Sequence, residues 1–296
     1  MKVSYIIVWA DTNTANKMDP KSHPKVNEEV NQALLKMTLF LIDQILQLNP
    51  HEILIMDNEG NFPEHDNPLV RVILSYQSYN FKDENFKRPS WLDKINISDY
   101  RGDIGMNHAK CCAMAYNHGI IESRGDYLVL QHNDTKYLFD NYSSDTVIKD
   151  AIDLLESEKY EYISVDKKSP KSQEYEKYEY LADCYWFLCR GDFYSKHNIW
   201  VDWTRGDNNH LATITCFDKG LKYLHLPGYF ENLEHCKYGR MDFKWERHYQ
   251  DCNRYHFNAQ YGYGTIDGNL HTLNDRPFLI HLKGGTGLYT ILKGKL

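Results

Sequence analysis

The stretch Gly125–Lys136, GDYLVLQHNDTK, is an apolar run that ends in side chains able to bind a metal ion or a charged ligand. Tyr127–Leu130 has no charged residue, is too short for a helix and is rich in strand formers, so it predicts a strand buried on both faces. His132, Asn133 and Asp134 follow it directly. In open α/β sheets, ligands bind beyond the carboxyl ends of the strands, where loops gather polar groups. We therefore expect the active centre at this strand end.

The elements that lead to this strand predict a parallel sheet. An apolar run opens the chain, and apolar residues spaced by three and four then indicate an amphipathic helix. The expected strands are 3–9, 52–56 and 70–75, and the expected helices are 26–48 and 107–122. This order of strand, helix and strand calls for a mostly parallel sheet with right-handed crossovers.

The second half of the chain is predicted to complete the same domain. The expected strands are 162–165, 221–226 and 278–282, and the expected helices are 144–157 and 241–257. The apolar run 184–189 is expected to belong to the core. Long polar stretches over 76–104 and 166–180 predict functional or surface loops. We expect one catalytic domain over 1–240, with an appended carboxyl-terminal extension over 241–296.

The composition excludes several classes of protein. The 296 residues can bury a sizeable core, and a net charge of -7 without a basic stripe argues against a nucleic-acid partner. The seven cysteines show no CxxC spacing, and their odd number without a recognisable signal peptide favours a reducing, cytoplasmic location. No window predicts a transmembrane segment. The 23 Tyr, 12 Phe and 6 Trp fit either core packing or faces that stack on sugars.

Several motifs in the first half resemble a known family. In order, VSYIIVWADTN, HEILIMDNEG and NHAKCCAMAYNHGIIESRGDYLVLQHND look like the nucleotide-sugar half of family-2-like glycosyltransferases of the GT-A fold. Asn117, Gly119, Gly125, Asp126 and Tyr127 match the family's lead-in to its DxD metal motif position by position. The order and spacing of these motifs carry the resemblance, because each motif alone is degenerate.

The second half resembles the same family. YWFLCRGDFY looks like its strand and turn, RGDNNHL sits at its acidic acceptor motif, YLHLPGYFENLEHC ends in a His where a metal ligand is often found, and CNRYHF resembles a later helix. The resemblance implies an α/β fold of GT-A type: a mostly parallel central sheet flanked by helices, with a Rossmann-like nucleotide-sugar half over 1–136, an acceptor half over 137–240 and a helical or irregular extension. The implied partners are a nucleoside-diphosphate sugar and a glycan or other hydroxyl acceptor.

Two positions depart from the family pattern. His132 replaces the first carboxylate of the DxD motif, and Asn208 follows Asp207 where the family has two acidic residues. The resemblance implies Asp134 as the chief ligand of Mn²⁺ or Mg²⁺, His235 as a second ligand, and His132 on the metal or the ribose. An imidazole ligand shifts the preference towards Mn²⁺ or a later metal. His225 or His281 are alternatives to His235.

The remaining candidate residues follow from the same resemblance. Asp11, Asp57 and Asn107 are expected to bind the donor, although an Asp at a strand end can equally form a turn. Asp207 is expected to be the base that takes the acceptor's proton in an inverting transfer, with a helix cap from residue 208 as the alternative. Trp186 and Trp203 are expected to stack on the acceptor, with core packing as the alternative.

Other classes of function remain open. A catalytically impaired relative that binds nucleotide or glycan is one, because two carboxylates of the family pattern are missing. A nucleotidyltransferase would need a basic Gly-rich loop after the first strand, which VWADTNT does not supply. A zinc hydrolase is not supported, because the sequence contains no HExxH motif.

Overall fold

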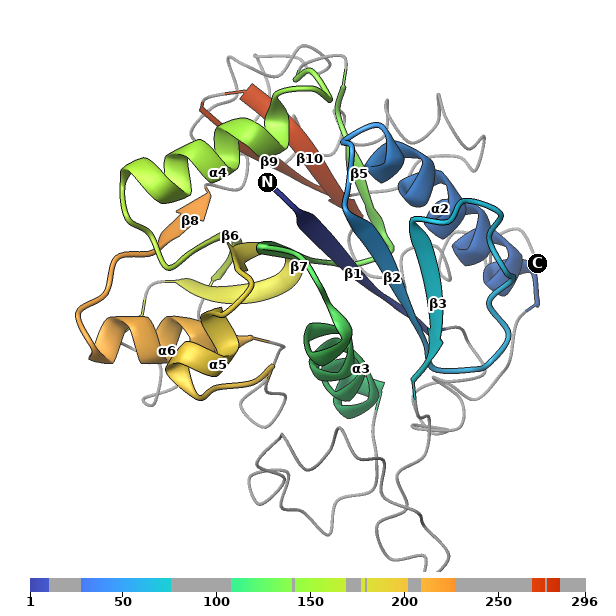
Figure 1. Cartoon of the computed structure of the whole chain (residues 1–296), viewed down its shortest axis with the longest axis horizontal. Helices are drawn as coiled ribbons and strands as arrows, with labels where there is room; N and C mark the ends of the chain where they lie inside the picture. The colour runs from blue at the N-terminus through green and yellow to red at the C-terminus, as the bar shows by residue number, and fades with distance from the viewer. Residues whose placement is uncertain are drawn as a thin grey trace, which may run out of the picture.

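A computed structural model describes residues 1–10, 28–75, 108–139, 142–168, 177–178, 180–201, 209–226, 268–274 and 276–282. Its centre is a seven-stranded sheet of order β3-β2-β1-β4-β7-β6-β8 (Figure 1). The strands are β1 (Val3–Trp9), β2 (Glu52–Asp57), β3 (Val70–Leu74), β4 (Tyr127–Gln131), β6 (Tyr162–Lys168), β7 (Tyr180–Arg190) and β8 (Leu224–Leu226). Each expected strand of the central sheet is therefore present.

The central sheet is mixed but mostly parallel. β1 pairs in parallel with β2 and β4, β2 with β3, and β6 with β8. β7 runs antiparallel to both of its neighbours, β4 and β6. The expectation of a mostly parallel sheet flanked by helices is confirmed.

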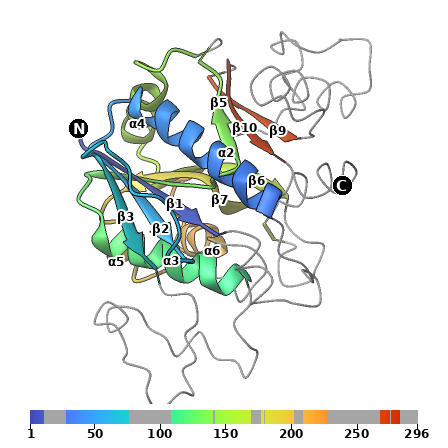
Figure 2. The same cartoon turned by 90° about the vertical axis from the view of Figure 1, so that its right-hand side faces the viewer.

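Helices cover both faces of this sheet (Figure 2). They are α2 (Glu28–Leu46), α3 (His108–Glu122), α4 (Val147–Ser157), α5 (Phe193–His197) and α6 (His210–Asp218). Apolar residues of α2 and α4 join Tyr5 and Ile7 of β1 in one core, whereas those of α3, α5 and α6 join Ile6 and Val8 in another. Successive strand residues point to opposite faces, so β1, which is apolar except for Ser4, supplies both cores.

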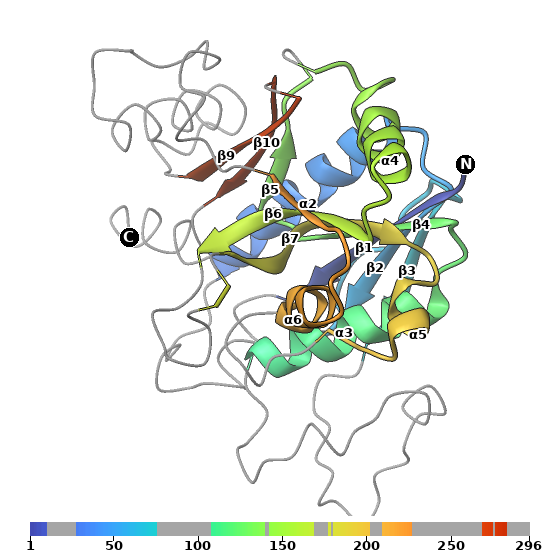
Figure 3. The same cartoon turned by 90° about the vertical axis from the view of Figure 1, so that its left-hand side faces the viewer.

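A second, smaller sheet joins distant parts of the chain. It has the order β5-β10-β9, built from β5 (Thr135–Tyr137), β9 (Gly268–Leu273) and β10 (Arg276–Leu282), and lies beside α2 (Figure 3). β10 pairs antiparallel with both β5 and β9. Residues assigned to the extension therefore pack against the strand that follows Asp134. The predicted domain boundary at residue 240 and the helix over 241–257 lie outside the described residues.

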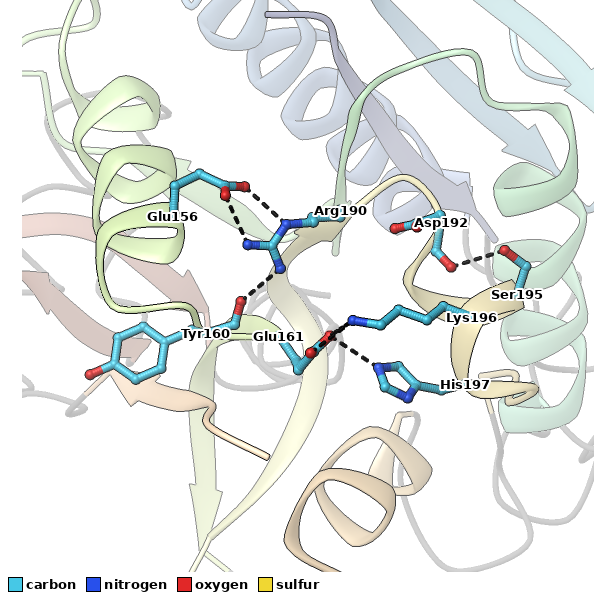
Figure 4. Close-up of polar contacts among 8 residues, drawn as sticks. All are labelled: Glu156, Tyr160, Glu161, Arg190, Asp192, Ser195, Lys196 and His197. Atoms are coloured by element: carbon cyan, nitrogen blue, oxygen red, sulfur yellow. Dashed lines mark hydrogen bonds and ion pairs between the residues drawn. The ribbon is translucent and has the colours of Figure 1, made fainter. Parts of the chain in front are cut away.

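Ion pairs hold the edge of the sheet where β6 begins and β7 ends. Arg190 donates to both carboxylate oxygens of Glu156 at 3.0 and 2.9 Å, and to the carbonyl of Tyr160 at 3.1 Å. Lys196 and His197 of α5 converge on Glu161, with the shortest distances 2.8 and 3.0 Å (Figure 4). Since β4 begins at this edge, these contacts lie at the opposite end of the strands from His132.

Candidate functional site

The carboxyl ends of the parallel strands β1, β2 and β4 lie at the same end of the sheet. β1 lies between β2 and β4, so the chain proceeds from β1 to β2 and β3 on one side and returns to β4 on the other. Such a reversal of strand order opens a crevice outside the carboxyl ends, where open α/β sheets bind their ligands. Trp9 ends β1 and Gln131 ends β4 on the two sides of this point. The structure therefore places His132 and Asp134 at the switch point of the sheet.

Hydrogen bonds from the core support the turn that follows β4. The indole N–H of Trp186 donates to the Tyr137 hydroxyl at 2.9 Å, and this hydroxyl donates to Oε1 of Gln131 at 3.0 Å. Gln131 Nε2 donates to Oγ1 of Thr135 at 2.8 Å, and the Thr135 hydroxyl donates to the carbonyl of His132 at 2.7 Å. The chain of bonds thus runs from a buried indole to the backbone of the candidate site.

This chain corrects the expectation that Trp186 stacks on the acceptor. Its side chain is 0% exposed and packs edge-on against Phe278 of β10, with ring centroids 5.1 Å apart. No face of the indole is open to a sugar. Trp186 is a core residue, which is the alternative that the sequence left open.

His132 lies between aromatic rings. It is stacked on Tyr116 of α3, with centroids 6.2 Å apart, and meets Tyr185 of β7 edge-on at 4.7 Å. Its side chain is 25% exposed, and its Nδ1 lies 3.7 Å from Oδ1 of Asp134. Two ligands of a small divalent ion stand about 3 to 3.5 Å apart when each is about 2.1 Å from the metal. Only a small rotation would bring both side chains to one cation.

A bulge in β7 brings a further carboxylate near this turn. The pairing of β6 and β7 shifts between Ser164 and Asp166, where β7 carries extra residues around Asp183 and Tyr185. Bulges often re-aim side chains next to functional sites. The His132 amide donates to the Tyr185 carbonyl at 3.3 Å, and Asp183 is buried. The negative charge of Asp183, followed by burial and the charge of Asp134, raises the pKa of the Tyr185 hydroxyl.

Asp183 and Tyr185 are site residues that the sequence did not indicate. They lie within an apolar strand pattern, and a bulge has no recognisable signature in that pattern. The only feature that could have pointed to Asp183 is an acidic residue inside an otherwise apolar run.

The predicted metal site fits the described residues in part. A carboxylate and an imidazole suit Mn²⁺ or a later divalent metal. In the described part of the chain, however, no group of three or more His, Cys, Asp or Glu side chains is arranged to hold a metal ion. His235, the expected further ligand, lies outside the described residues. Among the described residues, Asp134 and His132 are two that could contribute ligands to such a site.

Asp57 ends β2 at the same edge, and its carboxylate organises the loop that follows. Oδ1 accepts the backbone N–H groups of Glu59 and Gly60, each at 2.9 Å, and Oδ2 accepts that of Phe62 at 2.9 Å. Asp57 is buried, so in this structure it forms a turn, the alternative weighed for it from the sequence. Its expected contact with the donor stays a prediction.

The other predicted site residues are not placed. Asp11, Asn107, Trp203, Asp207 and His235 lie outside the described residues. Of the alternatives to His235, His225 is half-buried, its Nε2 is 3.0 Å from the Tyr162 hydroxyl, and desolvation of its ring lowers its pKa to about 4. A neutral His225 thus belongs to an aromatic cluster with Tyr162 and Tyr223.

Comparisons with known proteins give distant structural likenesses only. No family model matches the chain, and no curated protein matches it. Among solved structures, it is similar to TarS residues 1–349 from S. aureus, with a TM-score of 0.34 and 8% identity over 68% of this chain and 50% of that one. It is also similar to 4-diphosphocytidyl-2C-methyl-D-erythritol synthase from Anaerococcus prevotii, with a TM-score of 0.38 and 10% identity over 76% of this chain and 88% of that one.

The TarS fragment has also been solved in complex with UDP-GlcNAc, and this chain matches 49% of it at 11% identity with a TM-score of 0.34. The chain thus spans about half the length of the TarS fragment that it matches. TM-scores and sequence identities this low decide nothing about activity. The assignment to the α/β fold class rests on the seven-stranded, mostly parallel sheet of the chain itself. The described helices include none that is long and apolar enough to cross a membrane.

Proposed function

We propose that the protein is a glycosyltransferase that moves a sugar from a nucleoside-diphosphate donor to a glycan or another hydroxyl acceptor, with inversion and with the help of a divalent metal. One observation carries the proposal: His132 and Asp134 follow β4 at the carboxyl edge, at the switch point where open α/β sheets bind ligands. The resemblance of the motifs around β1, β2 and β4 to the GT-A glycosyltransferases supplies the class of reaction.

In this proposal Asp134 and His132 face the donor diphosphate. A bound Mn²⁺ or Mg²⁺, held by these two residues and His235, would supply positive charge to the leaving diphosphate. Asp11, Asp57 and Asn107 would contact the base and the ribose. The aromatic rings of Tyr116 and Tyr185 hold the His132 imidazole from two sides and so limit its rotation. A fixed imidazole loses less conformational entropy when it binds a ligand.

Asp207 is proposed as the base. Its carboxylate would take the proton of the acceptor hydroxyl as that oxygen bonds to the anomeric carbon, and the electron pair of the broken bond would leave with the diphosphate. Trp203 would contact the acceptor. The variant Asp207→Asn should abolish turnover while leaving the donor's dissociation constant unchanged, and undiminished transfer would exclude Asp207 as the base.

A thermal-shift screen tests the proposed substrate class. UDP, GDP, CDP, ADP and TDP and their sugars would be compared with and without Mn²⁺. A ligand that binds only the folded state stabilises it by about 2.7 kcal/mol at a hundred times its dissociation constant. We expect a Mn²⁺-dependent rise in melting temperature with at least one nucleotide. No rise with any of them would contradict the proposal.

A second candidate function is binding of nucleotide or glycan without transfer. It is favoured by His132, which stands where the family has a carboxylate. Slow hydrolysis of a bound nucleotide sugar would support the transferase. A Mn²⁺-dependent shift without hydrolysis of any nucleotide sugar would support binding alone.

A further inference from the structure

Two buried polar residues follow the ends of β2 and β3. β2 pairs with β3 up to Asp57 and Leu74, and Asn58 and Ser75 are the next residues of the two strands. Both residues are 0% exposed. Within the described part of the chain, neither the amide nitrogen and oxygen of Asn58 nor the hydroxyl of Ser75 has a hydrogen-bond partner. We call Asn58 and Ser75 the β2–β3 polar pair.

Buried groups of this kind destabilise a protein that has no ligand bound. An amide or a hydroxyl loses its hydrogen bonds to water when it is buried, and this loss is costly unless other hydrogen bonds replace them. Most buried polar groups in native structures therefore have a partner, and one without a partner calls for an explanation. A ligand that supplies the missing hydrogen bonds to the β2–β3 polar pair would gain binding energy from them.

The backbone around the β2–β3 polar pair is fixed. The N–H of Asn58 donates to the carbonyl of Trp9 at 3.1 Å, and the N–H of Ser75 donates to the carbonyl of Asp57 at 2.7 Å. The indole N–H of Trp9 donates to Oδ1 of Asn61 at 2.7 Å, which holds the loop after β2 from the side of β1. A ligand that binds here therefore loses little affinity to ordering of the backbone.

The β2–β3 polar pair lies on the same face of the sheet as His132. Side chains alternate along a strand, so Asn58 falls on the face of Met56, which packs in one core with residues of α3. His132 is stacked on Tyr116 of α3 and lies on this face as well. One ligand on the α3 side of the carboxyl edge can therefore approach both places.

The order of the strands sets the separation between these two places. Only β1 stands between β2 and β4, so Asn58 is two strand spacings, about 10 Å, across the sheet from the end of β4. A nucleoside diphosphate carries its base and its diphosphate on opposite sides of the ribose. With the diphosphate at His132 and Asp134, the base can extend along the carboxyl edge to the β2–β3 polar pair.

The β2–β3 polar pair offers both donors and acceptors. The amide of Asn58 donates through Nδ2 and accepts through Oδ1, and the hydroxyl of Ser75 can do either. A phosphate offers acceptors, so it would leave Oδ1 of Asn58 without a donor. The edge of a nucleobase carries donors and acceptors side by side, and an Asn side chain forms two hydrogen bonds with such an edge when it reads adenine in DNA. A base therefore fits these groups better than a phosphate.

We propose that Asn58 and Ser75 form the subsite that binds the base of the donor nucleotide. This inference rests on the proposed function, because only a nucleoside-diphosphate donor brings a base to this edge of the sheet. Since both residues are closed to solvent, the base reaches them through a local opening of the structure around them.

Two kinds of probe separate the base from the diphosphate. Calorimetry with Mn²⁺ would measure the dissociation constants of UDP, GDP, CDP, ADP and TDP, which carry a base, and of inorganic pyrophosphate, which does not. We expect Ser75→Ala and Asn58→Leu each to raise the dissociation constant of the nucleotide that the wild type binds by about tenfold, because each variant removes at least one hydrogen bond to the base. The dissociation constant of pyrophosphate should be unchanged.

The stability of the variants without ligand distinguishes a binding role from a structural one. Ser75→Ala and Asn58→Leu remove polar groups that have no partner, so the midpoint of urea denaturation should stay the same or rise. Ser4→Ala is the matched control, because Ser4 is also 0% exposed but its hydroxyl donates to Oε1 of Glu52 at 2.7 Å. This control should lower the midpoint and leave nucleotide binding unchanged. If Asn58→Leu does not fold, Ser75→Ala decides.

Unchanged nucleotide binding in Ser75→Ala and Asn58→Leu would overturn the inference. An equal loss of affinity for pyrophosphate would also overturn it, since the two residues would then act on the diphosphate and not on the base. A fall in the urea midpoint as large as that of Ser4→Ala would assign them to the fold instead. A wild-type protein that binds none of the nucleotides would overturn the proposed function itself.

Discussion

Replacing Gly119 with alanine tests how closely α3 must approach the sheet. A Cβ atom at this position would clash with Cγ2 of Ile6 on β1 and would lie 3.2 Å from Cγ and Sδ of Met56 on β2. Carbon atoms in contact normally stand about 3.5 to 4.0 Å apart, so the helix or the Ile6 side chain must move by about 1 Å or more. Met56 can adapt because its side chain is flexible, but Ile6 is branched and fully buried.

Two effects of opposite sign decide the outcome. Alanine favours a helix over glycine by about 1 kcal/mol, whereas overpacking a well-filled core costs about 1 to 3 kcal/mol. Because the approach to Ile6 is so short, we take the upper part of that range and expect a net loss of about 1 to 2 kcal/mol in the free energy of unfolding. Urea denaturation, with the slope compared between variants, measures this loss.

A double-mutant cycle with Ile6→Ala separates the contact from the effect on the helix. Ile6→Ala alone should cost about 2 to 5 kcal/mol because it leaves a cavity. The double variant should lose less than the sum of the two single losses, since the atom that meets the new Cβ is gone. If Gly119→Ala is as stable as the wild type, or if the two losses simply add, the close packing of α3 on β1 is contradicted.

Three further changes test other parts of the structure. Trp186→Phe should lower the free energy of unfolding by about 1 kcal/mol through loss of the bond to Tyr137, with an unchanged KM for the acceptor; a raised acceptor KM at unchanged stability would restore the stacking role. Arg190→Lys should lower the free energy of unfolding, measured by urea denaturation, by no more than about 1 kcal/mol, because the ion pair with Glu156 is partly exposed. A loss several times larger would show that the two parallel hydrogen bonds of the guanidinium group contribute more than an exposed ion pair does. Burial raises the pKa of Glu161, but hydrogen bonds from Lys196 and His197 outweigh this effect, so the net pKa is lowered. The Glu161 carboxylate therefore stabilises the fold at a pH above its unfolded pKa of about 4.3. This stabilisation is lost as the pH falls through the pKa of the folded state. The stability difference between wild type and Glu161→Gln should therefore shrink on going from pH 7 to pH 3, and a constant difference in urea midpoints would contradict this assignment.

The central sheet could be predicted because its strands carry their own signal. β1, β2 and β4 are apolar runs, and burial on both faces is what a parallel sheet between helices requires. The position of His132 and Asp134 could then be predicted, because they directly follow β4 and open α/β sheets bind ligands beyond the carboxyl ends of their strands. The roles of Asn117 and Gly119 could not be predicted in this way. Gly119 permits close packing of α3 on the sheet, and Asn117 binds both the backbone N–H and the carbonyl of Val201, 84 residues away.

The features that the sequence did not predict depend on contacts between distant segments of the chain. β5 has only three residues, and its partner β10 lies far along the chain, so no local pattern marks it. The bulge that brings Asp183 to the site is a property of the pairing of β6 with β7. Trp186 looked like a possible sugar contact because its type permits both roles, and only its burial shows which it has.

The Mn²⁺ dependence of nucleotide binding tests the central claim most directly. Calorimetry would compare the dissociation constants of UDP, GDP, CDP, ADP and TDP with and without Mn²⁺ for the wild type and for Asp134→Ala. Asp126→Ala is the matched control, since Asp126 is an exposed carboxylate that precedes β4 at its opposite end and accepts the Lys2 amide at 3.0 Å. We predict that Mn²⁺ tightens binding in the wild type and in Asp126→Ala but not in Asp134→Ala. A wild-type constant that Mn²⁺ leaves unchanged, or an increase in affinity that survives in Asp134→Ala, would contradict the proposed site.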